Sequence, residues 1–73
     1  MSEYIVALSW DADAAVWIAT SESIPGLALE SGSLDALIER ARFAVPELLI
    51  LNGIHEKNFS LLFRSERHEQ VCL

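Results

Sequence analysis

Four carboxylates near the predicted turns are the side chains whose type and spacing come nearest to a metal site. Asp11, Asp13, Glu22 and Glu30 could offer oxygen ligands to a hard cation such as Mg²⁺. Asp11 and Asp13 lie in a turn, however, where Asp side chains commonly accept hydrogen bonds from nearby backbone amides. No carboxylate lies inside the first two predicted strands, so a two-metal nuclease would lack ligands on rigid elements. We therefore predict no metal site.

The histidines, hydroxyls and thiol do not form a recognisable catalytic set either. His55 and His68 are far apart, and neither has a second ligand at a helical spacing. Cys72 is alone, so it cannot form an internal disulfide, and it has no evident neighbour that stabilises a thiolate. Capping and turn formation account for the serines near the turns, which are Ser21, Ser23, Ser31 and Ser33. The sequence thus predicts no catalytic residue, no cofactor and no enzymatic activity.

Alternation of apolar residues predicts three strands in the first part of the chain. Residues 4–10 and 16–21 both show a period of two, and the aspartate-containing segment 11–14 between them favours a hairpin. The Pro25-Gly26 pair then predicts a turn, after which residues 27–30 are long enough for a short strand. These elements together indicate an antiparallel meander.

A change to helical spacing predicts one amphipathic helix between Ser33 and about Leu51. Ser33 is suited to the N-cap, and apolar residues then recur three and four positions apart: Leu34, Leu37, Ile38, Ala41, Val45 and Leu48. Pro46 should kink or restart the helix, because proline has no amide proton to donate. Asn52-Gly53 supplies a C-terminal cap.

A period of two returns after the helix and predicts a fourth strand. Phe59, Leu61 and Phe63 alternate with polar and mixed residues up to Arg64, and the pattern leaves open the course of the chain beyond Arg64. The order β-β-β-α-β predicts an α+β fold, a two-layer sandwich with the helix on one face of a four-stranded sheet. A right-handed crossover is expected. A chain of 73 residues forms one domain, residues 1–73.

Charge and hydropathy limit the partners of this domain. A net charge of -6 opposes a phosphate backbone and disfavours direct nucleic-acid binding, whereas it suits a small basic protein; it also serves simply to keep an apolar chain soluble. The unbroken apolar runs, among them residues 43–45 and 48–51, are all far below the roughly 18 residues that span a bilayer. The N-terminus shows no signal-peptide pattern, so we expect a cytoplasmic location and no membrane contact.

The sequence contains more large apolar residues than one face of a small sheet requires. A four-stranded sheet with a single helix leaves its second face uncovered, and some helix residues do not belong to the buried stripe. Core packing is the alternative for each of the candidate interface residues, which are Trp10, Trp17, Phe43, Ile50, Leu51, Phe59 and Phe63. Because a core of this size supplies only about 3–5 kcal/mol, we expect a homodimer or higher homo-oligomer. It would form through the helix, the outer sheet face or the strand around residues 59–64.

Several of these motifs, in this order, resemble the N-terminal domain of HicB-type antitoxins. The residues that carry the resemblance span about Tyr4 to Phe63 and are segments 10–17 (WDADAAVW), 24–27 (IPGL), 33–37 (SLDAL), 45–49 (VPELL) and 52–53 (NG). The chain is most similar to a short, HicB-related family of uncharacterised bacterial domains. It departs from the pattern at Ala15, where a glycine is common.

The resemblance implies a degraded ribonuclease-H-like fold that lacks the catalytic carboxylates. It also implies a function, because HicB domains neutralise a small basic ribonuclease toxin by binding it. The leading hypothesis is therefore a non-catalytic, antitoxin-like protein-binding domain. Two alternatives remain at this stage, a small metal-dependent nuclease with the same fold and a structural self-assembling module.

Overall fold

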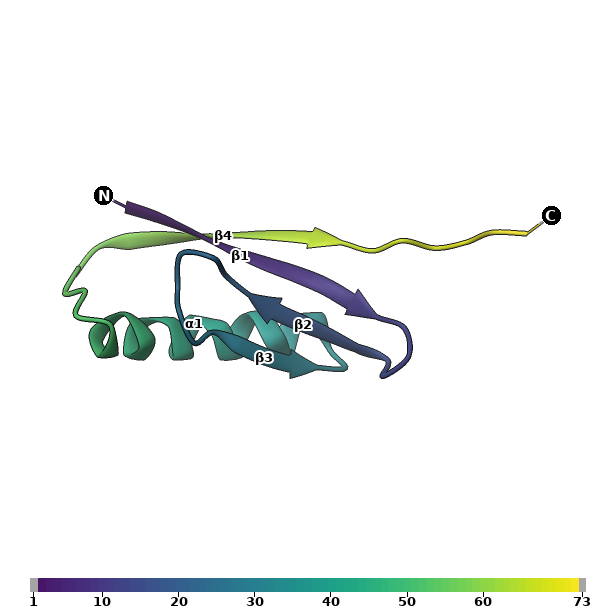
Figure 1. Cartoon of the computed structure of the whole chain (residues 1–73), viewed down its shortest axis with the longest axis horizontal. Helices are drawn as coiled ribbons and strands as arrows, with labels where there is room; N and C mark the ends of the chain where they lie inside the picture. The colour runs from purple at the N-terminus through teal and green to yellow at the C-terminus, as the bar shows by residue number, and fades with distance from the viewer. Residues whose placement is uncertain (1, 73) are drawn as a thin grey trace.

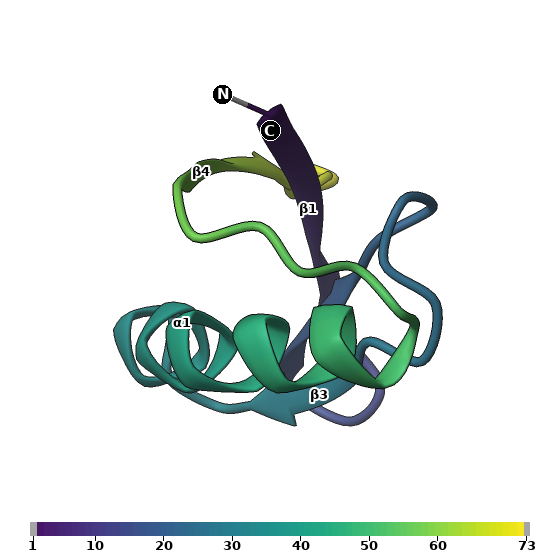
Figure 2. The ribbon, with the colours of Figure 1, turned by 90° about the vertical axis from the view of Figure 1, so that its left-hand side faces the viewer.

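A computed structural model describes residues 2–72 and contains one sheet and one helix (Figure 1). The elements in chain order are β1 (Ser2–Asp11), β2 (Val16–Thr20), β3 (Ala28–Ser31), α1 (Leu34–Leu51) and β4 (Phe59–Glu66). The helix lies on one face of the four-stranded sheet (Figure 2), so the predicted α+β sandwich is confirmed.

The strands are arranged in the order β3-β2-β1-β4, which brings the first and the last strand of the chain together. β1 pairs with β2 and β2 with β3 in antiparallel register, whereas β1 and β4 run parallel from Ser2↔Phe59 to Ser9↔Glu66. Both strands of the parallel pair extend beyond the predicted segments, because each supplies hydrogen-bond partners to the other along this register. β4 thereby becomes an edge strand (Figure 1).

The β1–β2 hairpin is closed by an aspartate and by a residue with a positive φ. Asp11 Oδ1 accepts hydrogen bonds from the backbone amides of Asp13, at 3.0 Å, and Ala14, at 3.3 Å. Ala15 then has φ 55°, in the left-handed region that a Cβ atom disfavours.

Side-chain and backbone caps fix both ends of α1 as predicted. The Ser33 hydroxyl accepts a hydrogen bond from the Ala36 amide at 3.2 Å. At the other end Gly53, with φ 77°, donates to Ile50 O at 3.0 Å, and Ile54 donates to Leu49 O at 2.8 Å. These two bonds form a Schellman motif, which satisfies carbonyls that the helix itself leaves without a donor.

The helix continues through Pro46 and does not restart there. Proline cannot donate to the carbonyl four residues earlier, so the bond to Arg42 O is missing, but burial of the opposite side of the helix keeps the two halves together. Val45, next to the proline, is fully buried.

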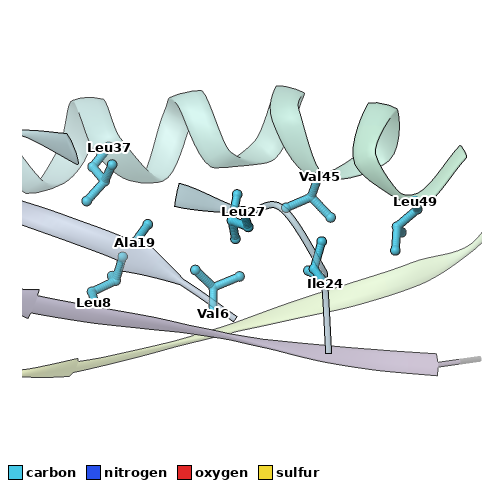
Figure 3. Close-up of a cluster of buried hydrophobic side chains, with 8 residues drawn as sticks. All are labelled: Val6, Leu8, Ala19, Ile24, Leu27, Leu37, Val45 and Leu49. Carbon is cyan, nitrogen blue, oxygen red and sulfur yellow. The ribbon is translucent and has the colours of Figure 1, made fainter. Parts of the chain in front are cut away.

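The core lies between α1 and the inner face of the sheet. Its buried side chains come from β1, β2, the loop before β3 and the helix, and Figure 3 shows how they meet: Val6, Leu8, Ala19, Ile24, Leu27, Leu37, Val45 and Leu49. The side chain of Asn52 joins two parts of this frame, because Nδ2 donates to Leu48 O at 2.8 Å and to Pro25 O at 3.2 Å.

Replacing Ala15 by glycine should stabilise the domain. Glycine has no Cβ atom to disfavour a positive φ, so we expect Ala15→Gly to raise the free energy of unfolding by about 1 kcal/mol. Ala14→Gly is the matched control, because Ala14 does not have a positive φ. Glycine at this position should lower the free energy of unfolding, since it raises the conformational entropy of the unfolded chain. Urea unfolding of both variants checks the prediction, and equal effects at the two positions would contradict it.

Tyr4 connects β1 to the loop that leads into β4. Its hydroxyl donates to Glu56 Oε2 at 3.1 Å, Ser2 Oγ donates to Glu56 Oε1 at 2.6 Å, and the Tyr4 ring meets Phe59 edge to face at 5.7 Å. Desolvation of the phenol, followed by the hydrogen bond to Glu56 and its charge, raises the pKa of Tyr4 above its ordinary value.

The only tyrosine of the chain makes this shift directly measurable. We expect the tyrosinate absorbance to appear at a pKa above that of free tyrosine, and Glu56→Gln to lower that pKa without abolishing the shift. Glu39→Gln, on the exposed side of α1, should leave it unchanged. Because the pKa of Tyr4 is raised in the folded state, the interactions of its neutral phenol contribute fully to stability below the unfolded-state pKa. That contribution is lost as pH rises through the folded-state pKa. Titration of Tyr4 as free tyrosine would refute the contact.

Candidate protein interface

The outer face of the sheet, turned away from α1, is an open surface with an apolar centre. Val6 and Leu8 face the core, so the residues that alternate with them face outward, and the strand registers extend this assignment to the other strands. The outer face therefore carries Ile5, Ala7, Ser9, Val16, Ile18, Thr20, Ala28 and Leu62. Ile5 lies beside Leu62 and is 38% exposed.

The small side chains in the middle of this face leave it hollowed. Two neighbouring hollows, of about 590 and 380 Å³, share the lining residues Ile5, Ala7 and Arg64. Ala7 and Ser9 are too short to fill the space between the larger side chains of neighbouring strands. The outer face can therefore receive side chains of another molecule.

Acidic side chains lie at the margins of the outer face. The same registers place Glu3 and Asp11 toward the two ends of β1, Glu30 on β3 and Glu66 on β4, whereas Arg64 is the one basic residue on these outward positions of the described strands. A basic partner is favoured by such a distribution, because exposed charge of one sign steers a partner of the other sign.

The helix presents a second apolar surface, on the side opposite the core. Phe43 is 70%, Ile50 59% and Leu51 81% exposed. Phe43 and Ile50 are seven residues apart, which is almost two helical turns, so their side chains lie on the same side of α1. The predicted surplus of apolar residues on the helix is therefore an exposed strip.

Trp10 and Trp17 form a third cluster, at the end of the β1–β2 hairpin. They are directly opposite in the register, with ring centroids 5.5 Å apart and planes at 59°. The guanidinium of Arg67 lies over Trp10, 4.2 Å from its ring centroid, and Arg67 Nε donates to Glu69 Oε1 at 2.6 Å. Arg67, the first residue after β4, thus contacts the hairpin, whereas the chain that follows, whose course the sequence left open, extends away from the sheet (Figure 1).

The structure separates the predicted interface residues into different surroundings. Phe59 and Phe63 are half-buried and pack against the core, since the register Val6↔Phe63 turns them inward, and Trp17 also packs there. Sequence reasoning named the outer face but not its apolar residues Ile18 and Leu62. The period of two contained that signal, because these residues alternate with the side chains that face the core.

Three of the polar residues considered for catalysis make structural hydrogen bonds. Ser21 Oγ donates to Ile5 O at 2.6 Å and Ser31 Oγ accepts from the Ser33 amide at 3.1 Å, while the Asp11 carboxylate closes the hairpin. Within residues 2–72, no three His, Cys, Asp or Glu side chains come together in a way that could hold a metal ion. In the same range, there is no helix that is both long and apolar enough to cross a bilayer.

Fold and surfaces define the chain as a small α+β domain whose sheet is open on one face. It belongs to a protein family described as a domain of unknown function (DUF1902), which matches residues 3–72. The chain is also similar to the crystal structure of hypothetical protein TTHA1013 from an extremely thermophilic bacterium, Thermus thermophilus, at 34% identity and a TM-score of 0.74. That likeness covers 97% of this chain and 99% of the other.

No curated protein matches the chain. The predicted membership of an uncharacterised family is confirmed by DUF1902. The finer likeness to HicB-type antitoxins stays a prediction, because neither the family description nor the name of the similar structure refers to HicB.

Removal of the Arg67 guanidinium should abolish the contact between the end of β4 and the hairpin. A cation over an exposed indole contributes about 0.5–1 kcal/mol, so we expect Arg67→Ala to lower the free energy of unfolding by that amount. Both tryptophans of the chain lie in this cluster, and their fluorescence emission should shift in the folded protein. Arg67→Lys is the control and should retain part of the effect. Unchanged emission in Arg67→Ala would refute the contact.

Proposed function

We propose that this chain is a non-catalytic protein-binding domain that binds a small basic protein through the outer face of its sheet, in the manner of a HicB-type antitoxin. The observation that carries the proposal is the uncovered outer face, with its apolar centre and acidic margins. We expect the two proteins to meet in the cytoplasm.

The apolar centre of the outer face is suited to supply the affinity. Burial of Ile5, Ile18 and Leu62 by a partner would remove apolar surface from water, which is the main favourable term in association. The hollows beside Ala7 offer space for protruding side chains of the partner. Contacts of this kind at the centre of an interface contribute most of the binding energy.

The acidic margins are suited to supply selectivity. Glu30 and Glu66 flank the apolar centre, and the chain as a whole has a net charge of -6. Charges at the rim of an interface mainly accelerate association and exclude partners of the same sign. A polyanion such as RNA is therefore disfavoured as the direct ligand, whereas a basic RNA-cleaving protein is favoured.

A capture experiment followed by binding kinetics tests this function. The purified chain is immobilised on a support and exposed to lysate of the host. The captured protein is then identified and purified, and the kinetics of its binding to the chain are measured. We expect the partner to be small and basic. Ile18→Ser should raise its dissociation rate about tenfold or more, whereas Glu30→Gln together with Glu66→Gln should lower its association rate. Higher salt should slow association more than it speeds dissociation.

Phe43→Ser, on the opposite side of the molecule, is the matched control and should leave partner binding unchanged. If the partner is toxin-like, its expression alone should arrest growth and co-expression of this chain should restore growth. Capture of an acidic partner, or tight binding of RNA or duplex DNA at physiological salt, would contradict the proposal. Magnesium-dependent hydrolysis of nucleic acid that Asp11→Ala abolishes would favour a nuclease instead.

A further inference from the structure

The outward side of α1 carries an ordered pattern of residue sizes. Ala36, Phe43 and Ile50 follow one another at intervals of seven residues, each about 10.5 Å along the axis, and Leu51 adjoins Ile50. All four side chains are exposed. The strip therefore has a small residue near the N-terminal end, an aromatic ring in the middle and a large aliphatic residue at the C-terminal end, with Leu51 exposed on one flank.

We propose that a second copy of this chain covers the strip, with the two α1 helices packed antiparallel and the Phe43 rings meeting at the two-fold axis. A symmetric pair of this type places the same surface of both copies in contact. This proposal goes beyond the expected self-association, because it names the surface of contact and the alignment of the two helices along it.

Residue size favours this register. When Phe43 lies at the axis, Ala36 is seven residues before the axis on one helix, and Ile50 is seven residues after it on the other. Antiparallel packing therefore places Ile50 of each copy over Ala36 of the other. A small residue opposite a large one lets helices approach closely, and symmetry repeats the contact at both ends of the strip.

Charge favours the same register. Arg40 precedes Phe43 by three residues and Glu47 follows it by four, and both are exposed on the same flank of the strip. Antiparallel packing places Arg40 of one copy beside Glu47 of the other, twice in the dimer, whereas a parallel two-fold pair would put the two charged flanks on opposite sides of the interface. Within one chain the two are about 10.5 Å apart along the axis and are not paired.

Arg40 contacts the edge of the sheet within its own chain. Its Nη1 donates to Glu30 O at 2.8 Å, which fixes the guanidinium beside β3 and leaves its other N–H groups available. The Phe43 strip lies on the side of the molecule away from the outer sheet face, so the dimer would present two outer faces to partners. The inference does not rest on the proposed function, because it is tested with the purified chain alone.

Charge reversal with sedimentation over a concentration series tests the dimer. We expect the wild type to associate, and Arg40→Glu or Glu47→Arg each to lower the association constant about tenfold, because two attractive pairs become repulsive. The double variant Arg40→Glu/Glu47→Arg should recover association. An equimolar mixture of the two single variants should form heterodimers in preference to either homodimer, because both close pairs are of opposite sign in the heterodimer and of like sign in each homodimer.

Two further variants separate this surface from the rest of the molecule. Phe43→Ser should yield a monomer with an unchanged circular dichroism spectrum, whereas Ile5→Ser on the outer sheet face should leave the dimer intact. The recovery by the double variant has no explanation within a single chain, so a purely structural role of Arg40 would not produce it. A wild-type monomer, or a dimer that none of the charge reversals and Phe43→Ser affects, would overturn the inference.

Discussion

Burial of one side of α1 against the inner face of the sheet is the interaction on which the rest of the structure depends. Leu37, Val45 and Leu49 from the helix meet Val6 and other side chains of the sheet and its loops, and this single layer of contacts is the core of the described chain. One helix can cover only one side of a sheet, so the same contact that forms the core leaves the second sheet face open.

The two uncovered sides of the molecule differ in chemistry and therefore suit different partners. The outer sheet face combines aliphatic side chains with hollows and acidic margins, which is favourable for a basic protein of different sequence. The outer side of α1 carries a small, an aromatic and a large aliphatic residue in succession, with Arg40 and Glu47 on one flank. This pattern favours binding of a second copy of the chain. Because the surfaces face opposite directions, occupation of one does not block the other.

The parallel pairing of β1 and β4 connects the open sheet to the end of the chain. It places β4 at the sheet edge and turns Phe59 and Phe63 toward the core. Continuation of the strand to Glu66 then brings Arg67 over Trp10. A pairing between residues far apart in sequence thus decides which aromatic side chains are half-buried and which charged group contacts the hairpin.

The sequence by itself determined the features that depend on neighbouring residues. The alternation of apolar residues, the Ser33 cap and the Asn52-Gly53 ending predicted the strands and helix to within a few residues, because these signals act within one or two turns. Only the tertiary structure decided the strand order, the parallel place of β4 and the face to which each alternating residue turns. A period of two separates the two sides of a strand, but the choice of the buried side depends on long-range pairing that local chemistry does not specify.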